Sequence, residues 1–308
     1  MPIGNHGDYD ANEDTMNPLI LLPCLDSKER AARCREVLDI PRARAAELGR
    51  TAVTATETGA YTSAEGHPVP WQAAVAQAVA VKRSLPPEAG LPVPAVARST
   101  QTRVQVANET TLTAARRLTD AGERVLALNF ANGIQPGGGF LSGARAQEEV
   151  LCRSSALYAT LRGDPMYAAH AVRTLPDSTD WAILSPDVLV FRTDDGAALP
   201  VPWALSVLSC AAPYATGIGQ PLAGDLLAVR IRRVLAIARA FDYSALVLGA
   251  WGCGAFGNGP VRTARDFHAA LAGEFNGAFA QVVFAIADWS SERRFLAPFR
   301  DLFAADMS

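Results

Sequence analysis

Short apolar runs alternate with helical patterns through most of the chain. Residues 125–130 read Val-Leu-Ala-Leu-Asn-Phe, and such a nearly continuous apolar run is typical of a strand that is buried on both faces. Similar runs rich in Val, Leu, Ile or Phe predict further strands at residues 103–106, 188–191, 205–210, 245–250 and 282–287. Helical patterns separate them, for example at residues 110–118 and 227–241. Strands that alternate with helices predict an α/β fold, in which helices cover both faces of a largely parallel sheet.

The first hundred residues have a different pattern, in which helical signals dominate. Residues 1–18 are polar and acidic, and we expect a disordered tail there. Ser27 is a typical N-cap for a first helix, and residues 71–85 are rich in Ala and Val without Gly or Pro, which predicts another helix. A cluster of prolines with a glycine then interrupts the pattern. After the tail we therefore expect a mainly helical accessory region at residues 19–100 and an α/β domain at residues 101–308.

Composition and charge narrow the classes of function. The chain has 308 residues, of which 49% are hydrophobic and 19% are charged, so it has enough apolar material for a packed core. The formal net charge of −3 argues against a broad basic face that grips a polyanion, and we expect no direct binding to DNA. If the ligand carries phosphates, backbone N–H groups and helix N-termini must hold them locally.

The cysteines and the apolar segments bear on compartment and metal content. Cys24, Cys34, Cys152, Cys210 and Cys253 are scattered and form no C-x-x-C pair, which predicts reduced thiols without a disulfide framework or a zinc site. The histidines are also isolated, so we expect no metal and no cofactor. No apolar run approaches the roughly 18–20 residues that a membrane span needs. We expect a soluble cytoplasmic protein that does not bind membranes.

A glycine loop follows the predicted strand at residues 125–130. Three consecutive glycines, Gly137, Gly138 and Gly139, lie between this strand and a helix that begins near residue 147. Ligands of open α/β sheets bind beyond the carboxyl ends of the strands. Glycines at that place permit positive φ and bring bare backbone close to a ligand. The loop is therefore a candidate binding site, with a flexible hairpin tip as the alternative.

Two adjacent glutamates, Glu148 and Glu149, fall in the first turn of the helix after this loop. Acidic residues are favoured there by about 0.3–1 kcal/mol, which is the structural alternative. Adjacent like charges repel, so we expect a raised pKa for one carboxyl, and a carboxyl that is protonated near neutral pH can act as general acid in glycoside cleavage. Neighbours in a helix do not face one another, so they cannot flank one bond as opposed carboxylates. One glutamate would serve as acid and base, and the other would hold substrate.

A second glycine loop runs from residue 249 to residue 259, again between a predicted strand and a helix. It contains G-x-G-x-x-G, which formally matches the dinucleotide-binding fingerprint. Asn258 as an N-cap and Pro260 as first helical residue place the helix start after the third glycine, whereas the fingerprint places this glycine within the helix. The motif also lies near the end of the chain, and no Lys-Ser/Thr pair of a Walker-type loop follows.

Together these segments resemble the poly(ADP-ribose) glycohydrolase family, in its bacterial form. The three glycines, a seven-residue spacer and then Gln147-Glu148-Glu149 resemble the family signature, and the preceding Phe130-Ala131-Asn132 matches it as well. Residues 106–118 are similar to the shorter bacterial members. The resemblance covers roughly residues 100–290, and the second glycine loop looks like the family's diphosphate-binding loop.

The resemblance implies a macrodomain-like catalytic domain at residues 101–308, with a mixed, largely parallel sheet. It implies hydrolysis of the ribose–ribose O-glycosidic bonds of poly(ADP-ribose), with Glu149 as general acid and base, Glu148 as the holder of ribose hydroxyls, and Asn132 as the residue that positions the ribose. Further ligand contacts are implied for Gly137, Gly138, Gly139, Gln147, Gly252, Cys253, Gly254, Ala255 and Phe256. The implied partners are poly(ADP-ribose) or ADP-ribosylated proteins as substrate and ADP-ribose as product, without a metal or cofactor.

Three alternatives stay open at the level of the sequence. They are a reader macrodomain that binds ADP-ribose without cleaving it, a mono-ADP-ribosyl hydrolase, and a nicotinamide-dependent oxidoreductase that uses the second loop. Tyr214 stands where the family often has Asn, so the contacts to adenine are not assigned. Other polar residues are expected to be structural: His170 in packing or at the surface, Asp194 in a turn between strands, and Arg230, Arg232 and Arg233 on a solvated helix face.

Overall fold

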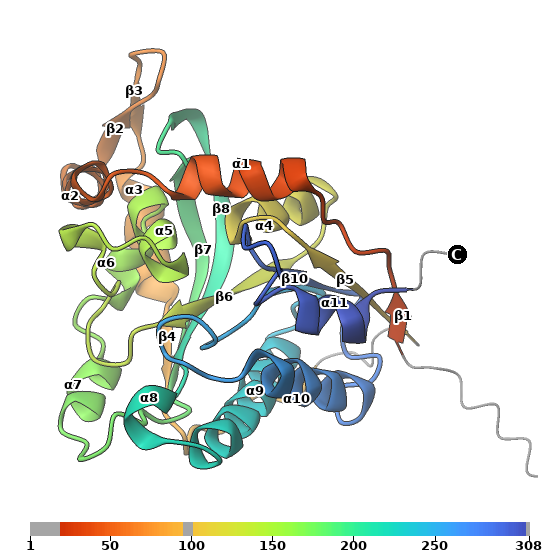
Figure 1. The fold of residues 1–308 in the computed structure, drawn as a ribbon. Coiled ribbons are helices and arrows are strands. Elements are labelled where there is room, and N and C mark those ends of the chain that lie inside the picture. Colours follow the sequence, from red (N-terminus) through yellow and green to blue (C-terminus); the bar gives the residue numbers. More distant parts are fainter. Residues whose placement is uncertain (1–18, 95–100, 306–308) are drawn as a thin grey trace, which may run out of the picture.

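A mixed eight-stranded sheet forms the centre of the computed structural model, which describes residues 19–94 and 101–305 (Figure 1). Its order is β1-β5-β10-β9-β6-β8-β7-β4. The first six strands in this order, from β1 to β8, are each parallel to their neighbours. The last two are antiparallel: β7 to β8, and β4 to β7. The strands are β1 (Leu19–Leu21), β4 (Arg83–Leu85), β5 (Thr102–Ala107), β6 (Val125–Ala131), β7 (Ala182–Arg192), β8 (Ala198–Ala211), β9 (Ala245–Leu248) and β10 (Gln281–Ala285). The expected α/β class with a largely parallel sheet is confirmed.

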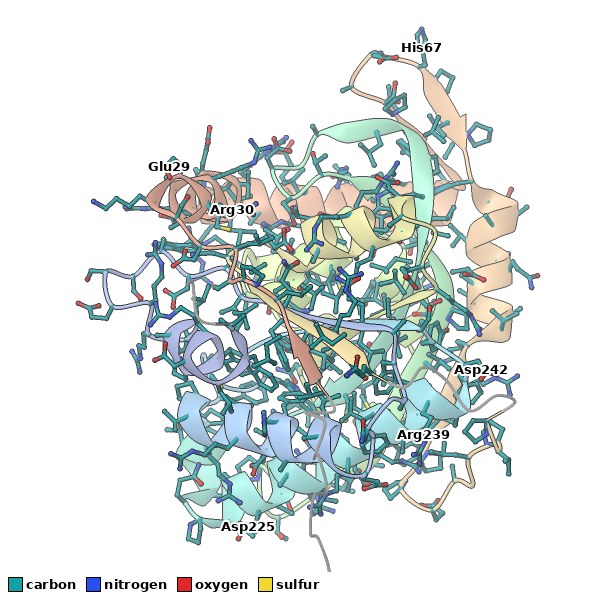
Figure 2. All side chains as sticks on the ribbon, turned by 90° about the vertical axis from the view of Figure 1, so that its right-hand side faces the viewer. Glu29, Arg30, His67, Asp225, Arg239 and Asp242 are labelled. Atoms are coloured by element: carbon teal, nitrogen blue, oxygen red, sulfur yellow. The ribbon has the colours of Figure 1, made fainter. Side chains whose placement is uncertain are left out.

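Helices cover both faces of the sheet, and Figure 1 shows α9, α10 and α11 on the side opposite α1 and α4. The helices are α1 (Lys28–Leu38), α2 (Arg42–Thr58), α3 (Gln72–Val81), α4 (Thr111–Asp120), α5 (Gln147–Ser154), α6 (Leu157–Leu161), α7 (Pro165–Ala171), α8 (Ala215–Ile218), α9 (Leu222–Ala240), α10 (Pro260–Ala272) and α11 (Ala297–Phe303). Figure 2 labels Asp225 and Arg239 on α9, across the sheet from Glu29 and Arg30 on α1. Among the helices of the described residues, none has both the length and the apolar character to cross a membrane.

The two-sided cover explains the apolar runs of the strands. In β6, Leu126 and Leu128 belong to the core on the side of α9 to α11, while Val125 and Ala127 belong to the core on the side of α2 to α6. Successive side chains of a strand point to opposite faces, so a strand that is covered twice needs apolar residues at nearly every position. Asn129 interrupts this pattern in β6, although it is fully buried.

The region before residue 95 is mainly helical, as expected, and it also adds two edge strands to the main sheet. Ser27 caps α1, because its Oγ accepts a hydrogen bond from the N–H of Arg30 at 3.2 Å. The helix expected over residues 71–85 is wrong at its end: α3 stops at Val81, and β4 follows and pairs with β7. Leu85 is buried in that pairing, so tertiary contacts override local helix propensity.

The strand β1 likewise pairs in parallel with β5. The expected division between an accessory region at residues 19–100 and a catalytic domain at residues 101–308 stays a prediction, and the sheet itself spans both parts. The expected tail at residues 1–18 lies outside the described residues.

A small hairpin stands out from the body of the protein. It consists of β2 (Ala60–Thr62) and β3 (Pro68–Pro70), and Figure 2 shows His67 at its tip. Its base is fixed by an aromatic cluster, in which the rings of Tyr61 and Trp71 lie 5.0 and 4.7 Å from the ring of Phe191. Aromatic pairs of this kind anchor the hairpin to β7 of the main sheet.

Candidate active site

The parallel strands β5, β10, β9, β6 and β8 all end at the same edge of the sheet, where the glycine loops after β6 and β9 lie. A pocket of about 270 Å³ is found there. Gln147, at the end of the first loop, and Gly254, in the second, both line it. The remaining wall is largely apolar and includes Phe130, Ile286, Trp289 and Phe295. The sheet topology therefore brings the ends of the two predicted loops to one pocket, but the residues of the described chain that line it do not include Glu148, Glu149, Asn132 or the three glycines of the first loop.

Glu148 ties the start of the first loop to helix α5. Its side chain is only 4% exposed. One carboxyl oxygen, Oε2, accepts a hydrogen bond from the N–H of Asn132 at 2.7 Å, and Oε1 accepts one from Nδ2 of Asn129 at 3.3 Å. Nδ2 of Asn129 also donates to Oγ of Ser209 on β8. Both oxygens of Glu148 are thus occupied by groups from the strand ends.

Burial raises the pKa of Glu148 to about 8. The nearby charge of Glu149 acts in the same direction, while the hydrogen bonds from Asn132 and Asn129 oppose it. The raised pKa that the sequence predicts for one of the two carboxyls is confirmed, and it falls on Glu148. Its largest cause is loss of water around the carboxylate, and repulsion from Glu149, the cause expected from the sequence, is smaller.

Glu149 is also buried, with 8% of its surface exposed, but its two oxygens differ. Oε1 accepts a hydrogen bond from the N–H of Gly139 at 3.0 Å. Oε2 is buried and has no hydrogen-bond partner among the residues that the structure describes. The first loop therefore holds this carboxyl by one oxygen and leaves the other available.

The middle glycine of the first loop has a specific steric role. Gly138 has a φ of +56°, and a Cβ atom at this position would collide with Oε1 of Glu149 and lie 3.1 Å from Oε2 of Glu148. A side chain is excluded both by the left-handed backbone and by the two carboxyl groups. The loop is packed on the glutamate pair, which argues against a flexible hairpin tip.

Asn132 and Gln147 complete the first loop. Oδ1 of Asn132 accepts hydrogen bonds from the N–H groups of Ile134 and Gln135, at 3.0 and 2.9 Å, and closes the turn that follows β6. The amide of Gln147 reaches back to β6, where it accepts from the N–H of Phe130 at 2.9 Å and donates to a carbonyl of the same strand. Both residues therefore fix the loop.

The second loop presents mainly backbone to the solvent. Gly254 and Ala255 are exposed, and Phe256 is half-buried, with its ring edge-on to Tyr214 at 5.7 Å. Within the described residues, the N–H groups of Gly254, Ala255 and Phe256 make no backbone hydrogen bond. Cys253 is buried, and burial raises the pKa of its thiol to about 11, so the residue fills the loop as a neutral group.

The predicted start of the helix after this loop is partly right. Pro260 is the first helical residue of α10, as expected, but Gly259 occupies the N-cap position that the sequence assigned to Asn258. The side chain of Asn258 instead turns back and donates to the carbonyl oxygens of Pro213 and Gly252, at 2.8 and 3.2 Å. It thereby joins the second loop to the segment after β8.

The expectation that Arg230, Arg232 and Arg233 form a solvated helix face is wrong for Arg230, whereas Arg232 is exposed. Arg230 is 2% exposed and donates hydrogen bonds to the carbonyl oxygens of Ala211, at the end of β8, and Asp177. Its helix covers the sheet, so the arginine meets the strand end instead of water. His170 is a buried packing residue, within the range expected: Nδ1 lies 3.0 Å from the carbonyl oxygen of Gly133, and Nε2 accepts from the N–H of Thr179.

The N-terminal helices also support the first loop. Nη1 of Arg145 donates to Oδ1 of Asp39 at 2.6 Å and to the carbonyl oxygen of Ile40 at 2.8 Å, in the link between α1 and α2. Helix α2 contacts both α5 and the short 3-10 helix η1 (Phe140–Ser142) of the loop. The glutamate-bearing segment is thus held between the sheet and the region before residue 95.

Comparisons with known proteins agree with this architecture. A family model described as "Microbial-type PARG, catalytic domain" matches residues 49–193. The crystal structure of poly(ADP-ribose) glycohydrolase from Thermomonospora curvata is 43% identical, with 85% of this chain and 100% of that chain covered and a TM-score of 0.78; a structure with the inhibitor ADP-HPD gives the same values. The enzyme from Deinococcus radiodurans, solved in complex with ADP-ribose, is 40% identical, with 74% and 96% covered and a TM-score of 0.69. No curated protein matches the chain.

Proposed function

The chain belongs to the poly(ADP-ribose) glycohydrolase family, and on this basis we propose that it hydrolyses the ribose–ribose O-glycosidic bonds of poly(ADP-ribose) and releases ADP-ribose. The observation that carries the proposal is the state of Glu149. One oxygen of its carboxyl is fixed by the N–H of Gly139, and the other is buried without a partner in the described part of the chain. A fixed carboxyl with one available oxygen suits a group that passes a proton to and from substrate.

In this mechanism Glu149 acts twice. As the bond between C1″ of the terminal ribose and the 2′-oxygen of the next ribose breaks, Oε2 of Glu149 donates its proton to that 2′-oxygen. The ribose left behind has oxocarbenium character. The carboxylate of Glu149 then takes a proton from water, whose oxygen bonds to C1″, and the acid form is restored. A single residue serves both steps because the adjacent glutamate points to the strand ends.

Glu148 and Asn132 hold the ribose in this proposal. Because the pKa of Glu148 is raised to about 8, its carboxyl is largely protonated near neutral pH. A neutral Glu148 adds no second negative charge beside the diphosphate. Both of its oxygens accept a hydrogen bond from the strand ends, and the oxygen that carries the proton can also offer its O–H to a ribose hydroxyl. The amide Nδ2 of Asn132 would donate to the same sugar.

The second loop would bind the diphosphate. The backbone N–H groups of Gly252, Cys253, Gly254, Ala255 and Phe256 form the proposed cradle. Those of the exposed residues Gly254 and Ala255 are free of backbone partners in the described residues, whereas the N–H of Cys253 already donates to the carbonyl oxygen of Ala250 at 3.1 Å. Successive backbone N–H groups in a turn bind anions without a basic side chain. The largely apolar pocket between the loops, with Trp289 and Phe295 in its wall, would take the adenosine end.

The test is incubation of the purified protein with radiolabelled poly(ADP-ribose) on an automodified carrier, with chromatography of released ADP-ribose. Glu149→Gln keeps the shape of the side chain and an acceptor for the N–H of Gly139, but it cannot donate or take up the proton. We expect it to lose at least about 10²-fold in turnover while ADP-ribose binding by calorimetry persists. Turnover by this variant would contradict the role of Glu149. Binding without release by the wild type would instead indicate a reader macrodomain.

A further inference from the structure

Arg153 is a buried cation that the mechanism above does not use. It lies in α5 one turn after Glu149, and only 1% of its surface is exposed. None of its three guanidinium nitrogen atoms has a hydrogen-bond partner among residues 19–94 and 101–305. Side chains at positions i and i+4 of a helix lie on the same face, so Arg153 shares the face that carries Glu149.

Such a position is unfavourable for an arginine unless negative charges lie near it. Burial lowers the pKa of Arg153 from its ordinary value, and the carboxylates of Asp194 and Glu149 act in the opposite direction. Arg145 adds a weaker repulsion. The two carboxylates are therefore close enough to interact with the guanidinium electrostatically, and they come from different elements of the fold.

Asp194 belongs to the turn between β7 and β8, which the sequence predicts correctly as a turn. It is 8% exposed, and its Oδ2 accepts a hydrogen bond from Oγ1 of Thr110 at 2.6 Å. Its other oxygen, Oδ1, is buried and has no partner in the described residues. Asp194 also lines the pocket between the glycine loops. Arg153 thus interacts electrostatically with the proposed acid/base residue and with a carboxylate that the mechanism does not use.

We propose that Arg153 is a positioning residue for Glu149: the positive charge of Arg153 stabilises the carboxylate that forms each time Glu149 gives up its proton. The carboxylate of Asp194 offsets part of the charge of Arg153. Arg153 keeps all its own protons throughout. The inference rests on the proposed acid/base role of Glu149. Without Asp194, the guanidinium of Arg153 would favour the carboxylate form of Glu149 over the acid form. Without Arg153, the newly formed carboxylate of Glu149 would lie in a buried site without the positive charge that stabilises it.

The experiment compares Arg153→Met, Arg153→Lys and Asp194→Asn with the wild type, and it measures kcat and KM for ADP-ribose release between about pH 5 and about pH 9. For Arg153→Met we expect a fall in kcat of about 10-fold or more and a pH profile moved to higher pH, because the lost cation no longer favours the ionised form. Arg153→Lys should recover part of the loss. Asp194→Asn should move the profile to lower pH, because the cation is then less offset.

The pH profile separates this role from a structural one. Arg153→Met leaves the carboxylate of Asp194 buried without its cation, so we expect a lower midpoint of thermal unfolding, whereas a merely structural role would leave the pH profile of kcat unmoved. Arg233→Met, on the distant helix α9, is the matched control and should keep wild-type kcat and pH profile. If Arg153→Met does not fold, the pH profile of Asp194→Asn decides.

Two results would overturn the inference. One is a wild-type kcat and pH profile for Arg153→Met while Glu149→Gln is inactive. The other is a loss of activity that follows the loss of stability, with an unmoved pH profile and no recovery in Arg153→Lys. An active Glu149→Gln would overturn the proposed function itself, so the two failures are distinguishable.

Discussion

Replacement of Glu148 by glutamine tests the electrostatics of the buried pair without changing its shape. The new carbonyl oxygen can accept the hydrogen bond from the N–H of Asn132. The new amide NH₂ group faces Asn129, whose own Oδ1 is buried without a partner in the described residues. If the side-chain amide of Asn129 flips, this Oδ1 accepts a hydrogen bond from the new amide. The variant should therefore fold, and it lacks the titrating group.

The magnitude follows from the pKa of Glu148, which rises from 4.5 to about 8 on folding. Between about pH 4.5 and about pH 8 the folded protein holds a proton on Glu148 that the unfolded chain has released. The contribution of protonated Glu148 to the free energy of unfolding is therefore fully present below about pH 4.5 and is lost as the pH rises through about 8. At about 1.4 kcal/mol per pKa unit, the complete loss is roughly 4–5 kcal/mol. Over the accessible range from about pH 5.5 to about pH 8.5 it amounts to about 3 kcal/mol.

The assay is urea unfolding at several pH values, with the free energy of unfolding compared between Glu148→Gln and the wild type. We expect the variant to gain about 3 kcal/mol relative to the wild type as the pH rises across that range. Glu274→Gln makes the same chemical change at an exposed position and serves as control, with the pH dependence of the wild type. A constant difference between Glu148→Gln and the wild type at all pH values would refute the reasoning.

Three further predictions concern the first loop. Gly138→Ala forces a side chain against Glu149 at a φ of +56°, so it should destabilise the fold by about 1–3 kcal/mol and reduce ADP-ribose release by at least about 10-fold, as thermal unfolding and the chromatographic assay would show. Gln147→Ala removes hydrogen bonds to β6 and should cost about 1–3 kcal/mol in urea unfolding. Arg145→Ala breaks a half-exposed ion pair with Asp39 and should cost only about 0.2–1 kcal/mol; a measured loss above about 2 kcal/mol would show that the link matters more than its exposure implies.

The fold class and the two loops were predictable because local patterns determine them. The strand β6 is readable from its apolar run, and the glycines with the following glutamate pair mark a loop that leads into a helix. The parallel order of the strands then brings the ends of β6 and β9 together. These inferences need only the periodicity of the sequence and the geometry of a covered sheet.

Other features depend on contacts between distant segments. Arg230 and Arg153 look like ordinary helix-surface arginines, and nothing in their local sequence signals that one reaches the end of β8 and the other is buried one turn after Glu149. The strand β4 has the composition of a helix end, and only its pairing with β7 makes it extended. Asn129 did carry a signal, since a polar residue inside a buried apolar run must have a buried partner.

The sheet order determines when the fold can be completed during synthesis of the chain. The strand β5 lies between β1, near the beginning of the chain, and β10, near residue 285. Until the ribosome has released β10, neither β5 nor β9 has its inner neighbour, and the pocket lacks Ile286, Trp289 and Phe295. Pairing between segments so far apart in the chain is slow to form. Glu148 and Glu149 are thus translated long before Ile286, Trp289 and Phe295, and the pocket is completed among the last steps of folding.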